Sequence, residues 1–266
     1  MTPTVAVVCP TYNARMFVTA SVESVLAQTV LPAELIVSDD GSTDGTADLV
    51  AERFGAGQRC AVRVIRNPHQ GPGATRNAGI RAARSDWIAF LDSDDEWLPN
   101  KLETVLGVLA AHPGVNLVCH SETHRKLDGS CQLLDYGARY VSGEPIGPQL
   151  FRANLFSTSA LVCRRDVVVA AGLFDETLPS AQDYELWLRM APAVRPFFVR
   201  EPLGVYVDRP GNITMSAPFG RIVNQARAMV RHRRLGGPSW PVPVAAALIR
   251  GFASVFKRRL MGTLGR

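Results

Sequence analysis

The sequence predicts an α/β protein with a mostly parallel central sheet flanked by helices, followed by a helical C-terminal extension. Over the first hundred residues, short β-branched runs alternate with segments of helical spacing, which is typical of βαβ units. Three of these runs end in a polar turn, and ligands of parallel sheets bind beyond the carboxyl ends of the strands. The extension begins near residue 216, where the chain becomes basic.

Composition indicates a folded cytoplasmic protein. Of the 266 residues, 47% are apolar, which excludes a disordered chain. The five cysteines are scattered without a C-x-x-C pair, so we expect reduced thiols rather than disulfides or a zinc site. The N-terminus runs directly into a strand-like segment, and no apolar stretch reaches the roughly 18–20 residues of a membrane span.

The elements of the first half follow one another regularly. β-branched and aromatic runs predict strands, and the intervening amphipathic or Gly-Pro-opened segments predict helices. The expected strands are 4–9, 34–38, 61–66 and 86–91, and the expected helices are 17–28, 44–54 and 74–83.

The run 92–97, DSDDEW, places four carboxylates within five residues at the end of a strand. Crowded carboxylates raise one another's pKa unless a cation relieves them. Asp92 and Asp94 are two apart and fall on one side of an extended segment. Their hard oxygens suit Mg²⁺ or Mn²⁺ shared with substrate phosphates. The alternative is a solvated acidic turn that caps a helix starting near Pro99.

Three polar turns, at 10–13, 39–44 and 92–95, should meet at one edge of the sheet. There Tyr12 can stack on a base, and Asp40 can accept a hydrogen bond from a base N–H, which favours uracil or thymine. Arg76, at the start of the helix 74–83, can offer a fork to a diphosphate or hold the acidic groups. Alternatively, Tyr12 fills a turn and Arg76 is a solvated helix residue. A Rossmann oxidoreductase is disfavoured because PTYN replaces G-x-G-x-x-G after the first strand.

Four motifs in this order resemble the family-2 inverting glycosyltransferases with the Rossmann-like GT-A fold, over roughly residues 3–215. They are PTYN at 10–13, DDGSTDGT at 39–46, G-x-G-A-T-R-N-A-G at 71–79 and DSDDEW at 92–97. The resemblance implies a nucleotide-binding half at about 1–98, an acceptor half at about 99–215 and an added extension at 216–266. It also implies a nucleotide-sugar donor, usually a UDP-sugar.

The resemblance further implies the roles of individual residues. The positions matching Tyr12 and Asp40 hold the base, and Arg76 approaches the uridine. Asp94 binds the divalent metal, Mg²⁺ or Mn²⁺, and Asp92 supports the ribose or the metal shell. The full set of implied donor-binding residues is Pro10, Tyr12, Asp40, Arg76, Asp92, Ser93 and Arg209. Arg76 lies in ATRN where the family usually has ARN, a minor departure.

The segment 182–190, QDYELWLRM, predicts a mostly buried helix with Asp183 in its first turn. By itself Asp183 is an acid stabilised by the helix dipole. The segment resembles the family's stretch that carries the catalytic base, although Gln182 stands where Glu is frequent. An inverting transfer needs one carboxylate to deprotonate the acceptor hydroxyl. Residues 208–214 resemble the flexible segment that closes over the donor, so Arg209 is expected to reach the diphosphate.

Between these motifs the pattern is less regular. One face of an extended segment would carry His120, Glu122 and His124. These residues could form an acceptor site or a second metal site. Alternatively, they are the polar end of a strand that lines the cleft. We favour the strand end, because the spacing is not H-E-x-x-H. Asp128-Gly129 predicts a hairpin turn, and strands are expected at 156–163 and 203–207.

The C-terminal region is strongly basic. Residues 195–266 carry 13 Lys/Arg against 2 Asp/Glu, a net charge of +11, whereas the rest of the chain carries −6. After a breaker-rich linker at 236–243, a helix is expected over 244–261. Its apolar stripe comprises Leu248, Phe252, Val255, Phe256 and Leu260, and its opposite face comprises Arg250, Ser254, Lys257 and Arg258. Either the helix lies on an anionic membrane, or the stripe packs on the preceding domain and the arginines are solvated.

The sequence therefore predicts a metal-dependent inverting glycosyltransferase that moves a sugar from a nucleotide diphosphate to an acceptor hydroxyl. We expect a carbohydrate or lipid-linked acceptor in cell-surface polysaccharide or glycolipid synthesis, no nucleic-acid partner, and a place at the inner face of the plasma membrane. Two alternatives stay open: a nucleotidyltransferase of similar fold, and a non-catalytic module that binds a nucleotide sugar or a membrane.

Overall fold

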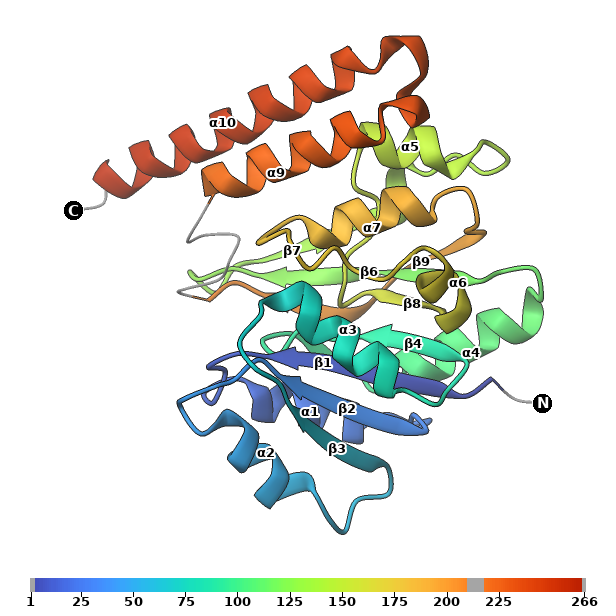
Figure 1. Cartoon of the computed structure of the whole chain (residues 1–266), viewed down its shortest axis with the longest axis vertical. Helices are drawn as coiled ribbons and strands as arrows, with labels where there is room; N and C mark the ends of the chain where they lie inside the picture. Colours follow the sequence, from blue (N-terminus) through green and yellow to red (C-terminus); the bar gives the residue numbers. More distant parts are fainter. Residues whose placement is uncertain (1–2, 210–217, 265–266) are drawn as a thin grey trace.

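The structure, a computed structural model, describes residues 3–209 and 218–264; the side chains of residues 218, 254 and 257–264 are not described. In these residues, nine strands form one mixed sheet with helices on both faces (Figure 1). The sheet order is β3-β2-β1-β4-β8-β6-β9-β5, and β7 pairs with β6 outside this path. The expected α/β fold with a helical C-terminal region is confirmed.

The elements follow the predicted order; in the second half, β9 is longer than the strand expected at 203–207, and β8 covers only the end of the strand expected at 156–163. The strands are β1 (Val5–Thr11), β2 (Glu34–Asp39), β3 (Ala61–Arg66), β4 (Trp87–Phe90), β5 (Glu96–Trp97), β6 (Leu117–Arg125), β7 (Cys131–Leu134), β8 (Leu161–Arg164) and β9 (Pro196–Val207). The helices are α1 (Val18–Leu26), α2 (Thr46–Phe54), α3 (Pro72–Ala82), α4 (Lys101–Ala111), α5 (Ile146–Arg152), α6 (Arg165–Ala170), α7 (Gln182–Met190), α9 (Pro218–Arg231) and α10 (Pro241–Leu264). Two 3₁₀ helices are η1 (Tyr136–Arg139) and η2 (Arg233–Ser239).

Most strands of the sheet run in one direction. β3, β2, β1 and β4 are parallel neighbours, and the helices α1, α2 and α3 connect these strands in chain order. Beyond β4, the strand β8 runs antiparallel to both of its neighbours, β4 and β6, whereas β9 is parallel to β6. The expected mostly parallel sheet is confirmed, because β6 and β9 point the same way as β1 to β4, and only β5, β7 and β8 run in the opposite direction.

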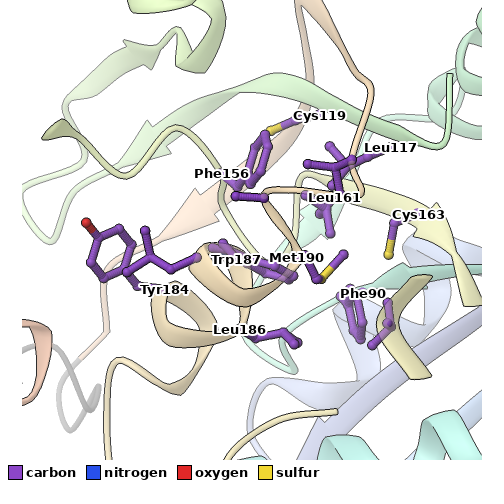
Figure 2. Close-up of a cluster of buried hydrophobic side chains, with 14 of the residues drawn as sticks. Phe90, Leu117, Cys119, Phe156, Leu161, Cys163, Tyr184, Leu186, Trp187 and Met190 are labelled. Atoms are coloured by element: carbon purple, nitrogen blue, oxygen red, sulfur yellow. The ribbon is translucent and has the colours of Figure 1, made fainter. Parts of the chain in front are cut away.

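Each face of the sheet has its own core, which explains the β-branched runs. Along β1, Val5, Val7 and Cys9 face a core built with α1, α2 and α4. Ala6 and Val8 face the other core, built with α3, α5, α6 and α7. A strand buried on both faces needs apolar residues at every position. Figure 2 shows the second core, where Phe90 from β4 lies beside residues of α7.

The C-terminal helices cover the side of the molecule opposite β3. α9 contacts α7, and α10 runs back along the outer side of α9 (Figure 1). The breaker-rich linker 236–243 forms most of η2 and the first turn of α10, so the last helix begins three residues earlier than expected. The expected boundary at residue 215 lies outside the described residues.

Candidate active site

The turns after β1 and β2 are joined at the carboxyl edge of the sheet, as the sequence predicts. The Thr11 hydroxyl donates to Asp39 at 2.9 Å, so the first acid of the DDGS run holds the loop together. The Asn13 N–H donates to Ser42, and the Thr43 N–H donates to the Asn13 side chain, both at 2.9 Å. Pro10 pairs with Ser38 at the end of β1, which extends two residues further than expected.

Tyr12 and Asp40 meet a residue that the sequence reasoning did not select. The Tyr12 ring is half exposed and stacks on His69, with 4.3 Å between ring centroids. Asp40 is buried; its carboxylate accepts the N–H groups of Gln70 and Gly71 and lies 2.8 Å from Nδ1 of His69. The His69 side chain is 58% exposed, so it is the one contact of Asp40 that can move aside without opening the loop.

Arg76 is buried, in contrast to the solvated alternative. Gly79, one turn later on α3, allows the helix to lie against β1, since a Cβ there would come within 2.5 Å of Val8. This close approach places the guanidinium over the strand ends, where it donates to Asp92 at 2.6 Å. Burial would lower the pKa of Arg76, but Asp92, Asp183 and Asp94 raise it above its ordinary value. In the described structure, its Nε and Nη1 have no partner.

The two aspartates of the expected metal site each contact one arginine. Asp92 accepts from Arg76, and Asp94 accepts from Arg209 Nε at 2.6 Å. Arg209 therefore reaches the acidic loop, and its guanidinium also lies over the Phe17 ring at 4.6 Å. Burial and the neighbouring Asp92 raise the pKa of Asp94, although Arg209 opposes this. Ser93, between the two, is buried.

This donor set fits a cation that takes few protein ligands. In the described residues, neither Asp92 nor Asp94 has a hydrogen bond to its second carboxylate oxygen. No group of three His, Cys, Asp or Glu side chains that could hold a metal occurs there either. Two carboxylates completed by substrate phosphates are the usual protein site for Mg²⁺.

Asp95 has a different task from its neighbours. It is 2% exposed and accepts hydrogen bonds from the Ser159 hydroxyl at 2.6 Å and from the Val207 N–H at 3.0 Å. Burial, followed by the nearby acids, raises its pKa well above the usual range. The helix cap expected near Pro99 is wrong, because α4 has Asn100 as its N-cap and no side chain caps it.

Ser159 connects the whole acidic loop to the second half of the chain. Its hydroxyl also accepts the N–H of Asp92 at 3.0 Å. Its carbonyl accepts from the Trp97 indole at 3.0 Å and from the Lys101 ammonium at 2.8 Å. Lys101 is fully buried over the Trp97 ring, and burial lowers its pKa well below normal. Nothing in the local sequence indicates these buried roles of Ser159 and Lys101, since a lysine in a first helical turn is ordinarily solvated.

Substitution of Ser159 by alanine should destabilise the fold. It leaves the buried Asp95 carboxylate without one of its two donors, and an unsatisfied buried group costs about 1–3 kcal/mol. The free energy of unfolding, measured with urea, is expected to fall by about that amount. Ser142→Ala removes an exposed hydroxyl and serves as the control. Equal stability of the two variants would contradict the role assigned to Ser159.

Asp183 lies in the first turn of α7, as predicted, on a helix anchored by its apolar side. Trp187 packs among Phe90, Phe156 and Phe174, with ring centroids 6.1–6.3 Å apart (Figure 2). Because Phe90 ends the strand that leads into the acidic loop, this core fixes the start of α7 relative to Asp92 and Asp94. In the described residues, no donor is bonded to the Asp183 carboxylate, which lies close enough to raise the pKa of Arg76.

The polar residues of β6 are not exposed to a cleft. His120 and Glu122 are both fully buried, and the Glu122 carboxylate accepts from the Tyr136 hydroxyl at 2.8 Å. Burial lowers the pKa of His120 and raises that of Glu122. Our expectation that this strand end lines the cleft is wrong for these two residues, whereas His124 faces Asp208 at 3.1 Å.

Comparison with solved structures finds the same architecture in other proteins. The structure of Staphylococcus aureus TarS 1–349 in complex with UDP-GlcNAc superposes with a TM-score of 0.70 over 89% of this chain and 71% of that one, at 19% identity. The mannosyltransferase PcManGT from Pyrobaculum calidifontis, in complex with GDP-Man and Mn²⁺, gives 0.67 over 100% of this chain and 80% of that one, also at 19% identity. These likenesses confirm the GT-A fold.

Sequence comparison assigns the family. An uncharacterized glycosyltransferase of Haemophilus influenzae is 30% identical over 74% of this chain and 66% of its own length. The chondroitin synthase of Escherichia coli is 31% identical over 73% of this chain but only 27% of its own length, so the chain spans part of these relatives. The sequence profile of Glycosyl transferase family 2 matches residues 6–146, which carry the turns and acidic loop described above. The chain therefore belongs to glycosyl transferase family 2.

Proposed function

We propose that this chain transfers a sugar from a nucleotide-diphosphate donor, most simply a UDP-sugar, to an acceptor hydroxyl with inversion. One observation carries the proposal: buried Arg76 interacts electrostatically with Asp92, Asp94 and Asp183 together. This arrangement supports the proposal, because the loop proposed to bind the diphosphate and the carboxylate proposed for the acceptor both lie near Arg76. The UDP-GlcNAc complex of TarS and the names of the synthase relatives support this class of reaction.

In the proposed donor complex, the base stacks on Tyr12 and its N–H donates to Asp40. The side chain of His69 then leaves Asp40, while the two backbone N–H donors of the loop stay in place. The diphosphate lies against Arg209 and near Arg76, whose buried Nε and Nη1 have no partner in the described residues. Pro10 and Ser93 shape the floor of this site.

The proposed reaction is a single displacement. Asp183 accepts the proton of the acceptor hydroxyl while that oxygen forms a bond to the anomeric carbon. The bond from this carbon to the β-phosphate oxygen breaks, and its electron pair leaves with the nucleoside diphosphate. A divalent cation, Mg²⁺ or Mn²⁺, held by Asp94 with Asp92, would supply positive charge to the departing diphosphate. Arg76 and Arg209 stabilise the same charge through hydrogen bonds.

The acceptor is proposed to be a growing carbohydrate or a lipid-linked sugar, in cell-surface polysaccharide or glycolipid synthesis on the cytoplasmic side. The relatives named chondroitin synthase and hyaluronan synthase favour a polysaccharide product. We expect no nucleic-acid partner.

A donor screen tests the reaction class. The chain is incubated with UDP-glucose, UDP-GlcNAc or GDP-mannose and Mn²⁺, and the products are separated by ion-exchange chromatography. Nucleoside diphosphate that accumulates faster with an acceptor sugar is the expected result, and the anomeric configuration of the product, from NMR coupling, should be opposite to that of the donor. Release of pyrophosphate would instead indicate nucleotidyl transfer and overturn the proposal.

A further inference from the structure

The last two helices form an outer layer of the molecule. α9 contacts α7, and α10 contacts α9 on the side away from the sheet (Figure 1). Gly251 lets the pair approach closely, because a Cβ there would come within 2.7 Å of Ile222. One side of α10 therefore packs on the preceding part of the chain, as one of the two alternatives from the sequence predicts.

The other side of α10 is also apolar, and it is exposed. The inner stripe, spaced by four and three residues, contains Val244, Leu248, Gly251 and Val255; its two valines are buried and Leu248 packs on the core. A second stripe with the same helical spacing contains Val242, Ala245, Ile249, Phe252 and Phe256. Val242, Ile249 and Phe256 are each 68% exposed. The single stripe expected from the sequence therefore combined residues of two faces, and Leu260 lies outside the described side chains.

A groove continues this outer stripe toward α9. It has a volume of about 380 Å³ and is lined by Phe219, Phe252, Ala253, Val255 and Phe256. The Phe219 and Phe252 rings, one from each helix, lie 5.9 Å apart. Its lining is almost wholly hydrocarbon and aromatic, so it suits an acyl chain better than a polar ligand.

The same hairpin is entirely free of acidic residues in sequence. Residues 218–264 contain nine Lys/Arg and no Asp or Glu. Among the basic side chains that the structure describes there, Arg231 contacts Asp175 and Glu185, and His232 contacts Glu185. Arg221, Arg227, Arg233, Arg234 and Arg250 are exposed.

The apolar outer stripe and the basic charge of the hairpin together favour one binding partner. A second copy of the chain would bring two acid-free basic hairpins together, and like charges repel. A bilayer with anionic headgroups offers apolar chains to the outer stripe and negative charge to the arginines. None of the helices in the described part has the length and apolar character needed to cross a membrane. We propose that the α9–α10 hairpin docks in the plane of an anionic membrane surface through the outer stripe of α10.

If the proposed function is correct, docking through α10 also sets the distance between the membrane and the site where the acceptor binds. Only α10 and α9 separate α7 from the membrane, and each helix is about 10 Å across. Asp183, at the start of α7, then lies within about 20–30 Å of the lipid headgroups. This distance suits an acceptor sugar attached to a lipid.

Vesicle co-sedimentation tests the docking without donor or acceptor, so its result is independent of transferase activity. The full chain should sediment with phosphatidylcholine vesicles that contain phosphatidylglycerol, less with phosphatidylcholine alone, and less at high salt. The double variant Ile249→Ser, Phe256→Ser should bind at least about tenfold more weakly, because it removes two exposed apolar side chains that the bilayer would bury. The control is Leu127→Ser, Leu133→Ser, which alters exposed apolar residues on the β6–β7 hairpin. Thermal melting of each variant verifies that it is folded.

Three results would overturn the proposal. The first is absence of binding by the full chain to anionic vesicles. The second is equal binding by the outer-stripe variant and the control, which would leave the arginines as the sole cause. The third is a concentration-dependent dimer of the full chain in analytical ultracentrifugation that the outer-stripe variant abolishes, since a second copy would then cover the stripe.

Discussion

Replacement of Asp183 by asparagine is expected to lower the turnover of sugar transfer by about 10²–10⁴-fold, the usual contribution of a general base. Asparagine keeps the size of the side chain and its hydrogen bonds but cannot take up the acceptor proton. The affinity for the donor, measured by calorimetry with UDP, should stay within about twofold, because the proposed donor contacts lie on other loops. Steady-state kinetics should show the loss in kcat at saturating donor and acceptor.

A helix-terminal acid without chemistry would behave differently. Asp166 occupies the same position in α6 and pairs with Arg164 at the surface, so Asp166→Asn is the matched control. Each substitution weakens its interaction with a helix dipole by about 0.3–1 kcal/mol, which affects stability but not the rate. Full turnover by Asp183→Asn, or joint loss of UDP binding and turnover, would remove Asp183 from the proposed role.

Replacement of Asp94 by alanine is expected to reduce metal-dependent turnover by at least about a hundredfold. A bound cation stabilises the departing diphosphate by several kcal/mol, and each 1.4 kcal/mol corresponds to a tenfold change in rate. The site offers two carboxylates in total, so the loss of one removes half of its protein ligands. Titration of Mn²⁺ in the presence of UDP, followed by electron paramagnetic resonance, should show a matching loss of affinity.

Glu96 supplies the control for this experiment. It lies two residues further along the same acidic run, at the start of β5, and pairs with Arg125 at 3.1 Å. Glu96→Ala should therefore bind Mn²⁺ as the unaltered chain does. If Asp94→Ala retains the Mn²⁺ affinity of this control, the proposed metal ligand is wrong, whatever its turnover.

In the first half of the chain, local sequence patterns were sufficient to predict the strands and the site residues. The β-branched runs become strands because a parallel strand buried on both faces needs an apolar side chain at every position. The turns after β1, β2 and β4 meet because the carboxyl ends of parallel strands share one edge. Arg76, Asp92 and Asp94 could be selected for this reason, before any contact was known.

Local sequence patterns could not predict which of two residues of the same type becomes buried. Asp94 and Asp95 are neighbours in the same acidic run, yet Asp94 meets Arg209 whereas Asp95 is buried under Ser159. Ser159 lies 64 residues away in sequence, and such a partner leaves no periodic or local signal. The order of strands β8, β6 and β9 in the sheet was likewise not predicted, since it depends on long-range pairing.

The sequence by itself determined the strand ends, the helix that carries Asp183 and the basic character of the last helices, because spacing and composition act within a few residues. The tertiary structure decided which polar groups become buried partners and which stay available. It placed His69 on Asp40, buried Lys101 beneath the acidic loop, and divided one apolar pattern of α10 into a packed face and an exposed face. Burial depends on what the rest of the chain brings to a side chain, and a linear pattern does not contain that information.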